Sequence, residues 1–205
     1  YTLEPNGVLT VEAKMSAATL SEAPRYGVRW RMPQEFSNVR YYGRGPWENY
    51  CDRKDGAMLD IYSCDVKDMY VPYVRPQENG HRVDARWLEI LNDKGKGVVI
   101  CAQSPFEFNT LHNSVEDFDC EESDAPYQWN NFVENDPHDV GRARNVMKKQ
   151  THVSDITPRD FTEVSIDSMM TGVGGDNSWG AETYDKYKVN TSVPQTLVFK
   201  SILVK

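Results

Sequence analysis

The stretch "WLEILNDKGKGVVICA", residues 87–102, decides the fold class of this 205-residue chain. Two short runs rich in apolar residues flank the segment 92–97, which combines asparagine, aspartate and two glycines. Asn, Asp and Gly tolerate the positive φ angles of tight turns, so the pattern predicts a β-hairpin. The glycines do not indicate a phosphate-binding loop, because the segment does not match G-x-x-x-x-G-K-[ST].

The same period of two recurs on both sides of this hairpin. Apolar and polar residues alternate in "GVLTVEAKM" (7–15), "RYGVRWRM" (25–32) and "FTEVSIDS" (161–168), and the chain closes on the strand-like run "QTLVFKSILVK" (195–205). Such alternation is typical of antiparallel strands with one buried and one solvated face. Because no long apolar stripe with a period of 3.6 is present, the sequence predicts an all-β sandwich.

Shorter signals divide the strands. Tight reversals are expected at "PNG" (5–7) and "ENG" (78–80). Six of the nine residues in 116–124 are acidic, and no clear period follows up to residue 150. We interpret the acidic run as a solvated surface, with a calcium site as the alternative, and the whole excursion as a long surface loop with room for one helical turn.

Charge and composition exclude some classes of function. The net charge is −8 and the pI is about 5.0, which disfavours binding to nucleic acid or to an anionic membrane surface. No apolar run approaches the roughly 20 residues of a membrane helix. The chain starts without a methionine or a signal peptide, so we interpret it as a piece of a longer protein whose compartment the sequence does not disclose.

The sequence offers no metal site and no catalytic residue of its own. The four cysteines contain no C-x-x-C pair and are interpreted as buried or incidental thiols, with their pairing left open: Cys51, Cys64, Cys101 and Cys120. The four histidines show no metal-binding spacing: His81, His112, His138 and His152. No pair of carboxylates stands out as the acid and nucleophile of a glycosidase.

The segment "TGVGGDNSWG" (171–180) is the strongest functional signal in the residues themselves. Gly172, Gly174 and Gly175 permit backbone angles that are closed to other residues. Asp176, Asn177 and Ser178 can hydrogen-bond back to the turn and brace it. Trp179 would then be held out as a flat apolar surface with one N–H donor, which suits the C–H face of a sugar ring. The alternative is that Trp179 closes one end of the core.

Two aromatic stretches, "YYGRGPWENYCDR" (41–53) and "MYVPYVRPQENGHR" (69–82), mix Tyr, Trp, Pro, Gly and Arg. Such stretches form rigid, irregular loops in which hydroxyl and guanidinium groups bind the backbone. They are interpreted either as structural corners of the sandwich or as a rim of sugar-binding residues.

Three stretches in order, "YYGRGPWENYCDR", "YVPYVRPQENGHRVDARWL" and "GVGGDNSWGA", together resemble the C-terminal domain, or small chain, of the large bacterial β-galactosidases of glycoside hydrolase family 2. The resemblance extends from about Leu3 to the end of the chain. It implies one domain over 1–205, folded as the large antiparallel supersandwich that aldose (galactose) mutarotases also use. Residues 121–150 look like an insertion relative to the family pattern.

The resemblance also implies a function. The parent enzyme would hydrolyse terminal β-D-galactosides such as lactose with retention, using two glutamates, Mg²⁺ and Na⁺ in a barrel domain that is absent here. This chain alone would be inactive, and Trp179, with Asn177 and Ser178 beside it, would form a platform for the substrate. A mobile loop of the family corresponds to Arg25 through Arg29, with Gly27 as its hinge.

Further expectations follow from the same resemblance. The partners would be the β-galactoside substrate and the other domains of the parent chain, within a homo-oligomer in the cytoplasm or periplasm of a bacterium. No nucleic acid or membrane partner is expected. Two departures from the family pattern bear on sugar preference: Cys51 replaces a proline, and "AETYDKY" follows the Trp179 segment.

Two other interpretations stay open. One is a carbohydrate-binding sandwich module without a catalytic partner. The other is a mutarotase-like epimerase, which needs a histidine and a carboxylate in one cleft of this chain. His112 and His152 are the candidates for that histidine, because both are expected in the middle of strands.

Overall fold

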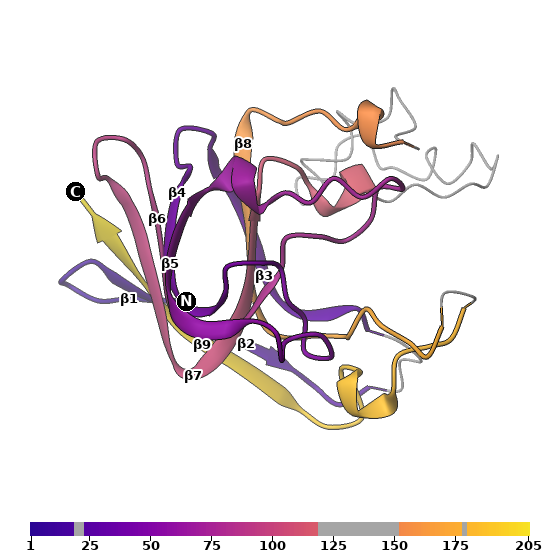
Figure 1. Ribbon diagram of the computed structural model, residues 1–205. Helices are drawn as coiled ribbons and strands as arrows, with labels where there is room; N and C mark the ends of the chain where they lie inside the picture. Colours follow the sequence, from indigo (N-terminus) through magenta and orange to yellow (C-terminus); the bar gives the residue numbers. More distant parts are fainter. Residues whose placement is uncertain (19–22, 119–151, 178–179) are drawn as a thin grey trace, which may run out of the picture.

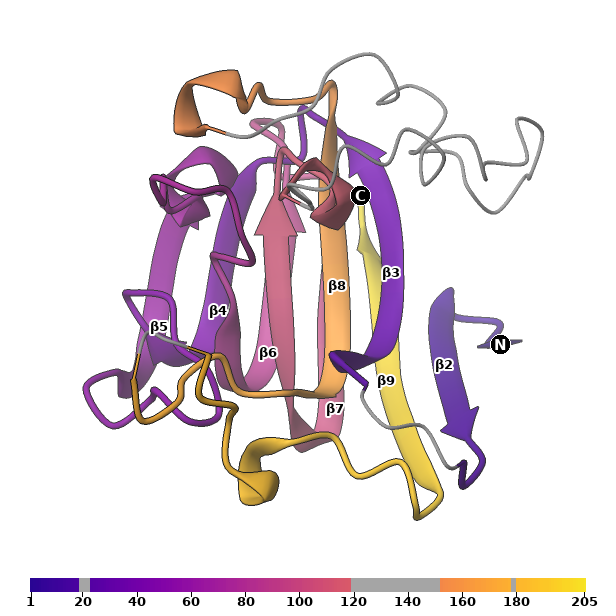
Figure 2. The same ribbon diagram turned by 90° about the vertical axis from the view of Figure 1, so that its right-hand side faces the viewer.

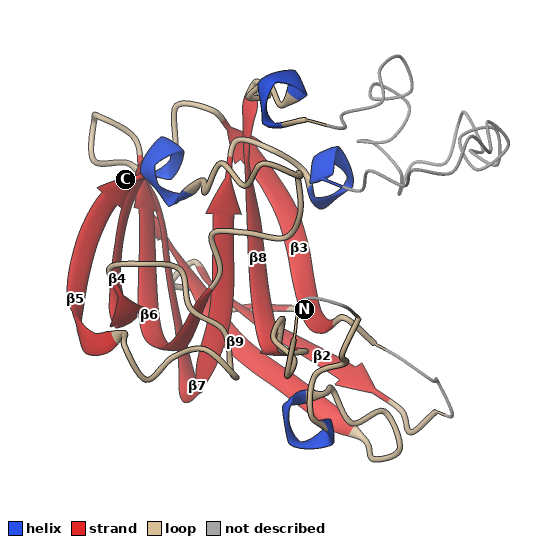
Figure 3. Ribbon diagram, turned by 45° about the vertical axis from the view of Figure 1, so that its right-hand side comes forward, coloured by secondary structure: helices blue, strands red, loops and turns tan. Residues whose placement is uncertain are grey.

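The computed structural model describes residues 1–18, 23–118, 152–177 and 180–205 (Figure 1). These residues form nine β-strands: β1 (Thr2–Leu3), β2 (Val8–Met15), β3 (Arg25–Pro33), β4 (Asn38–Gly45), β5 (Met58–Asp65), β6 (Arg82–Leu91), β7 (Gly97–Leu111), β8 (Phe161–Met170) and β9 (Gln195–Val204). Four 3₁₀ helices lie in the loops: η1 (Val66–Met69), η2 (Val115–Phe118), η3 (Val153–Asp155) and η4 (Asp185–Tyr187) (Figure 3). The prediction of an all-β fold is confirmed.

All strand pairs are antiparallel, and β7 is the branch point of the sheet (Figure 2). The main path runs β1-β2-β9-β7-β6-β4-β5, while β8 pairs with β7 and β3 pairs with β8. The first part of β7, Gly97–Cys101, pairs with β9, and its last part, Glu107–Leu111, pairs with β8. Two wings of strands, β9-β2 and β8-β3, therefore leave the same long strand.

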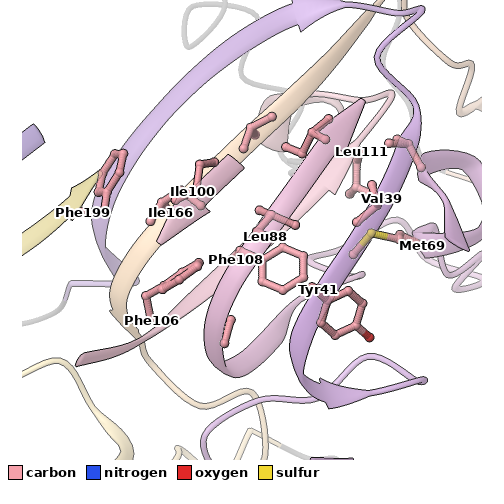
Figure 4. Close-up of a cluster of buried hydrophobic side chains, with 14 of the residues drawn as sticks. Val39, Tyr41, Met69, Leu88, Ile100, Phe106, Phe108, Leu111, Ile166 and Phe199 are labelled. Atoms are coloured by element: carbon pink, nitrogen blue, oxygen red, sulfur yellow. The ribbon is translucent and has the colours of Figure 1, made fainter. Parts of the chain in front are cut away.

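The two wings pack against each other through their apolar faces. The ring of Trp30 in β3 stacks on that of Phe199 in β9 with centroids 6.2 Å apart. The hydroxyl of Tyr26 in β3 donates a 2.6 Å hydrogen bond to the carbonyl oxygen of Ala13 in β2. The buried core continues from there across β6, β7 and β4 (Figure 4). This is the sandwich arrangement that the alternating pattern predicts.

The hairpin at 92–97 is confirmed. Gly95 adopts a φ of +71°, and the Asn92 side-chain oxygen accepts hydrogen bonds of 3.0 Å from the backbone N–H groups of Lys94 and Lys96. The "PNG" turn is also confirmed, because it joins β1 to β2 with Gly7 at a φ of +86°. The "ENG" prediction is wrong as a reversal between paired strands: residues 78–80 lie in the irregular segment that leads into β6.

The prediction that one face of β8 is solvated is wrong. Glu163, Ser165 and Asp167 are as buried as Val164 and Ile166, which alternate with them. The reason is that β8 lies between two strands, and arginines of its neighbour β3 cover the polar face. For example, Arg31 Nε lies 3.0 Å from Glu163 Oε2, and Arg29 Nη1 lies 3.3 Å from Glu163 Oε1.

The acidic run beginning at Glu116 also differs from its prediction as a solvated surface. Glu116 pairs with Arg29 at 2.8 Å, and Asp117 is buried against Arg159. Residues 119–151, and with them the rest of the acidic run and the whole predicted insertion at 121–150, lie outside the described residues. Within the described part of the chain, no helix is long and apolar enough to span a membrane.

Candidate functional site

The predicted substrate platform is only partly described. Trp179 and Ser178 lie outside the described residues, so their predicted roles stay predictions. Asn177 is exposed on the loop that precedes them. The two arms of this loop, residues 171–177 and 180–184, are described, and they show how the protein holds the loop in place.

The first arm rests on the carboxylate of Asp52, which lies in the loop between β4 and β5. Asp52 Oδ1 accepts a 3.2 Å hydrogen bond from the Val173 N–H, and Asp52 Oδ2 accepts one of 2.7 Å from the Gly174 N–H. A carboxylate that accepts two backbone N–H groups makes charge-assisted bonds, which are stronger than neutral ones. Loops that are far apart in the sequence thus meet below the strands (Figure 2).

The glycines of the first arm allow neighbouring groups to lie close to the backbone. A Cβ atom on Gly172 would lie 2.4 Å from the carboxyl carbon of Asp52, and one on Gly175 would lie 2.2 Å from the carbonyl oxygen of Ala181. Neither Gly172, Gly174 nor Gly175 has a positive φ. The prediction that these glycines supply unusual backbone angles is therefore wrong; they leave room for neighbouring groups instead.

The second arm is tied back to the first by two side chains. The Thr183 hydroxyl lies 2.8 Å from the carbonyl oxygen of Gly172 and 2.6 Å from that of Gly174. The Tyr184 hydroxyl donates a hydrogen bond to Asp176 Oδ1. Asp176 thus ties the two arms together, whereas the prediction was a hydrogen bond back to its own turn.

A hollow of about 530 Å³ lies between these arms and the segment before β3. This volume falls in the range of small-molecule sites, roughly 300–1,000 Å³. Its lining is mixed, with small, apolar and charged side chains: Ala23, Pro24, Met170, Thr171, Gly172, Val173, Gly174, Ala181, Glu182, Thr183, Lys188 and Val189.

Cys51 supports the base of the loop. Its thiol donates to the carbonyl oxygen of Met170 at 3.3 Å, next to the point where the chain leaves β8. Burial raises the pKa of this thiol to about 11, so it is neutral at pH 7. Cys51, Cys64 and Cys101 are all free thiols, while Cys120 lies outside the described residues.

Gly27 lies inside β3, so the expectation of a loop at Arg25 through Arg29 is wrong in this structure. The segment pairs with β8, and the register shifts at a bulge between Tyr26 and Gly27. A Cβ atom on Gly27 would lie 2.0 Å from Asp167 Oδ1. The glycine allows two strands to meet over a buried carboxylate, and its role as a hinge stays a prediction.

Sequence reasoning missed a buried polar cluster under the loop. His81 Nε2 lies 3.0 Å from Glu107 Oε2, which also accepts a 2.7 Å hydrogen bond from the Met170 N–H. Arg25 lies 3.7 Å from Asp167 and 3.2 Å from Glu78. The pairings of β7 with β8, of β8 with β3 and of β6 with β7 bring these residues together, so no local signal in the sequence could have found them.

The electrostatics of this cluster indicate a structural role. Burial raises the pKa of the Asp167 carboxyl, and the attraction of Arg25 opposes this shift. His81 is fully buried, so in this chain a substrate has no access to its ring. The cluster fixes Met170, the last residue of β8, through the hydrogen bond that Glu107 accepts from the Met170 N–H.

The two predicted epimerase histidines are not in strands. His112 directly follows β7, and its Nδ1 lies 3.0 Å from the Phe161 carbonyl oxygen. His152 precedes η3 and is exposed. Neither residue lines the hollow described above. Among the described residues, no group of three or more His, Cys, Asp or Glu side chains is placed to hold a metal ion.

Comparison with known proteins covers nearly the whole chain. A family model described as β-galactosidase small chain matches residues 1–201. The chain is 33% identical to a β-galactosidase of Priestia megaterium over 98% of its own length and 17% of that protein. It is 29% identical to a β-galactosidase of Halalkalibacterium halodurans over 97% and 17%, and 26% identical to β-galactosidase BgaC of Bifidobacterium adolescentis over 96% and 16%. The chain thus spans about a sixth of the length of these curated relatives.

Proposed function

Because this chain belongs to the β-galactosidase small-chain family, we propose that it is the C-terminal domain of a retaining β-galactosidase that hydrolyses terminal β-D-galactosides. The observation that carries the proposal is the similarity over nearly all of the chain to proteins named β-galactosidase. The catalytic glutamates, Mg²⁺ and Na⁺ belong to a barrel domain elsewhere in the parent protein. The parent is a homo-oligomer in which this domain contacts the other domains of its chain.

The domain contributes a substrate platform, Trp179, to the active site of the parent. The contacts of the loop arms support this role, because Asp52 and Thr183 fix both sides of the segment that carries the indole. A loop fixed in advance loses less conformational entropy when substrate binds than one that must be ordered by it. An aromatic face against the C–H groups of a galactose ring then adds binding free energy at a defined position.

The domain alone has no glycosidase activity in this proposal. Glu107 and Asp167 lie on paired strands, but both are buried and their neighbours are His81 and Arg25. Retaining hydrolysis needs two carboxyl groups that face the scissile bond. Turnover of a chromogenic β-galactoside by the purified 205-residue chain would contradict this part of the proposal.

The experiment that tests the platform is Trp179→Ala in the full-length enzyme. Loss of a stacking surface is expected to weaken substrate binding by about one to three kcal/mol. Unfolding temperature should stay close to that of the wild type, because the role is in binding. Kinetics equal to the wild type would mean that Trp179 does not contact substrate.

A further inference from the structure

One edge of the sheet carries a run of exposed apolar side chains. Strand β5 ends the main strand path and, among the described strands, pairs with β4 alone (Figure 2). Met58, Leu59 and Ile61 of this strand are exposed, and Trp47 in the preceding loop keeps 73% of its surface exposed. Single apolar side chains on a surface are ordinary, but a contiguous group is typical of a protein–protein contact.

These four residues, here called the edge patch, are neighbours in the structure. Ala57, which directly precedes Met58, lines the same hollow of about 380 Å³ as Trp47. Leu59 and Ile61 are two positions apart in β5, so they lie on one face of the strand, and Met58 lies on the other. The edge patch therefore continues from the loop onto both faces of β5.

Another edge of the sheet is protected in a way that β5 is not. Strand β3, the edge of the β8–β3 wing, carries Arg25, Arg29 and Arg31 and ends at Pro33. Charged side chains and proline are common means by which an edge strand avoids contact with another chain. Strand β5, with the sequence MLDIYSCD, contains no proline, lysine or arginine. An apolar edge of this kind needs a partner that covers it.

The backbone of β5 is partly occupied by its own side chains. The Asp60 carboxylate accepts a 2.7 Å hydrogen bond from the Ile61 N–H. The Tyr62 hydroxyl donates one of 3.0 Å to the Met58 carbonyl oxygen. These contacts disfavour the addition of another strand, which needs free N–H and C=O groups at the edge. We therefore expect a partner to bind through the apolar side chains of the edge patch.

The loop that carries Trp47 is fixed before any partner binds. The buried Asn49 side chain donates to the carbonyl oxygens of Arg44 and Trp47 at 3.1 and 2.9 Å. The Pro46 carbonyl oxygen accepts a 2.7 Å hydrogen bond from Arg82. A surface that is already ordered loses little conformational entropy when it enters an interface.

Several charged side chains near the edge patch already pair with one another. Arg44 and Lys54 both bind the carboxylate of Asp84. Arg53 binds that of Glu48. Because these charges are neutralised within the domain, the partner does not have to supply opposite charges. We therefore expect the surface that covers the edge patch to be apolar.

From this geometry we infer that the edge patch is the surface on which the remaining part of the parent protein docks. The inference rests on the proposed function, in which this chain is one domain of a longer enzyme. The chain spans 16–17% of the length of three curated relatives, so most of such a protein lies outside it. Because that part is covalently linked, it acts at a high effective concentration and outcompetes separate molecules. Permanent interfaces are also more apolar than transient ones, which agrees with the composition of the edge patch.

Hydroxyl-radical footprinting of the full-length wild-type enzyme tests the inference. Each rate of labelling is compared with the rate in the urea-unfolded enzyme. Trp47 and Met58 are exposed in this domain, but in the native enzyme we expect them to react about tenfold more slowly, because the centre of an interface excludes water. Val74, which is 82% exposed in the segment before β6, is the control. It should slow by less than about threefold, as a residue of a surface loop.

Ile61→Glu and Val193→Glu form a matched pair of variants in the full-length enzyme. The two side chains are 49% and 47% exposed in this domain, and Val193 lies outside the edge patch, shortly before β9. A glutamate at position 61 would be buried without a partner if the parent covers the edge patch. Ile61→Glu should therefore lower the unfolding temperature and remove most of the protection of Trp47 and Met58. Val193→Glu should leave both unchanged.

Two results would overturn the inference. If Trp47 and Met58 are slowed no more than Val74, the edge patch is open to solvent in the whole enzyme. If their protection disappears when the oligomer dissociates on dilution, as followed by size-exclusion chromatography, a second copy covers the patch instead. Failure of the proposed function is a separate result: an enzyme that protects the edge patch but cleaves no β-galactoside would refute the function and leave the docking surface in place.

Discussion

Asp52 Oδ2 accepts a 2.7 Å hydrogen bond from the Gly174 N–H across 122 positions of sequence. Asp52 also accepts a hydrogen bond from the Val173 N–H. Through these two bonds, the loop between β4 and β5 supports the glycine-rich loop that follows β8. Because Asp52 follows Cys51, whose thiol binds the Met170 carbonyl oxygen, two consecutive residues fix both the start and the first turn of that loop. The position of the first arm of the glycine-rich loop therefore depends on a segment distant in sequence.

Replacement of Asp52 by alanine is predicted to loosen the glycine-rich loop in the full-length enzyme. Two hydrogen bonds to a charged acceptor are lost, and because both are exposed to solvent each contributes about 0.5–1.5 kcal/mol. We expect a higher KM with a smaller change in kcat, and faster hydrogen exchange at the amides of residues 172–174.

The matched variant Asp52→Asn keeps the shape and one acceptor oxygen, so it should fall between Asp52→Ala and the wild type. If Asp52→Ala leaves both the exchange rates and KM unchanged, the two hydrogen bonds of Asp52 do not position the glycine-rich loop.

Gly172→Ala is predicted to destabilise the domain. The added methyl group would lie 2.4 Å from the Asp52 carboxyl group, so the carboxylate or the loop must move. Such overpacking costs about 1–3 kcal/mol in the free energy of unfolding. Gly56→Ala is the control, because a Cβ atom there meets nothing within 4 Å. Chemical denaturation of the two variants should separate them clearly; similar unfolding midpoints would contradict the role of Gly172.

The strands and hairpins could be predicted from the sequence because their signals are local. Alternation in β2 and β3, and the Asn-Asp-Gly turn at 92–97, depend on residues that are neighbours in the chain. The branch at β7 has no such signal. It depends on one 15-residue strand that pairs with β9 at its start and with β8 at its end.

The candidate site shows the same limit. A hydrogen bond of Asp176 could be expected because short polar side chains in turns bond to nearby groups, but its partner, Tyr184 on the far arm, could not be named. The Asp52 clamp and the His81–Glu107 pair could not be predicted, because each joins residues from different loops or strands. The burial of Glu163 on β8 could not be predicted for a related reason. A polar residue in an alternating strand is expected on the solvated face unless its arginine partners are known.

Loss of Arg159 is predicted to be costly. Its guanidinium binds both carboxylate oxygens of Asp117, with Nε 3.0 Å from Oδ2, and the Asp117 side chain is fully buried. Arg159→Ala leaves that charge without its arginine partner, which costs about 3–5 kcal/mol in the free energy of unfolding.

The control is Lys14→Ala, which removes an exposed pair with Glu12 at 3.1 Å. Exposed pairs contribute about 0–1 kcal/mol. Equal effects of the two variants on the unfolding midpoint would mean that the burial of Asp117 does not increase the loss of stability caused by removing its arginine partner.

Asp84 is predicted to make stability depend on pH. Burial of this carboxyl group opposes its ionisation, but hydrogen bonds from Arg44 and Lys54 outweigh that effect, and the pKa of Asp84 is lowered in the folded protein. A lowered pKa means that the folded state favours the charged form. The stabilisation is therefore complete above the pKa of an unfolded aspartate, about 3.9, and is lost as the pH falls through the folded pKa.

Asp84→Asn isolates this contribution. Asp84 has a φ of +57°, a conformation that asparagine also tolerates, so the substitution keeps the backbone and removes the charge. The variant should be less stable than the wild type at pH 6, and the difference should shrink as the pH falls below about 4. Thermal unfolding of both proteins between pH 3 and pH 6 measures this directly. A gap in unfolding temperature that stays constant over the range would mean that the two cations do not hold Asp84 in its charged form.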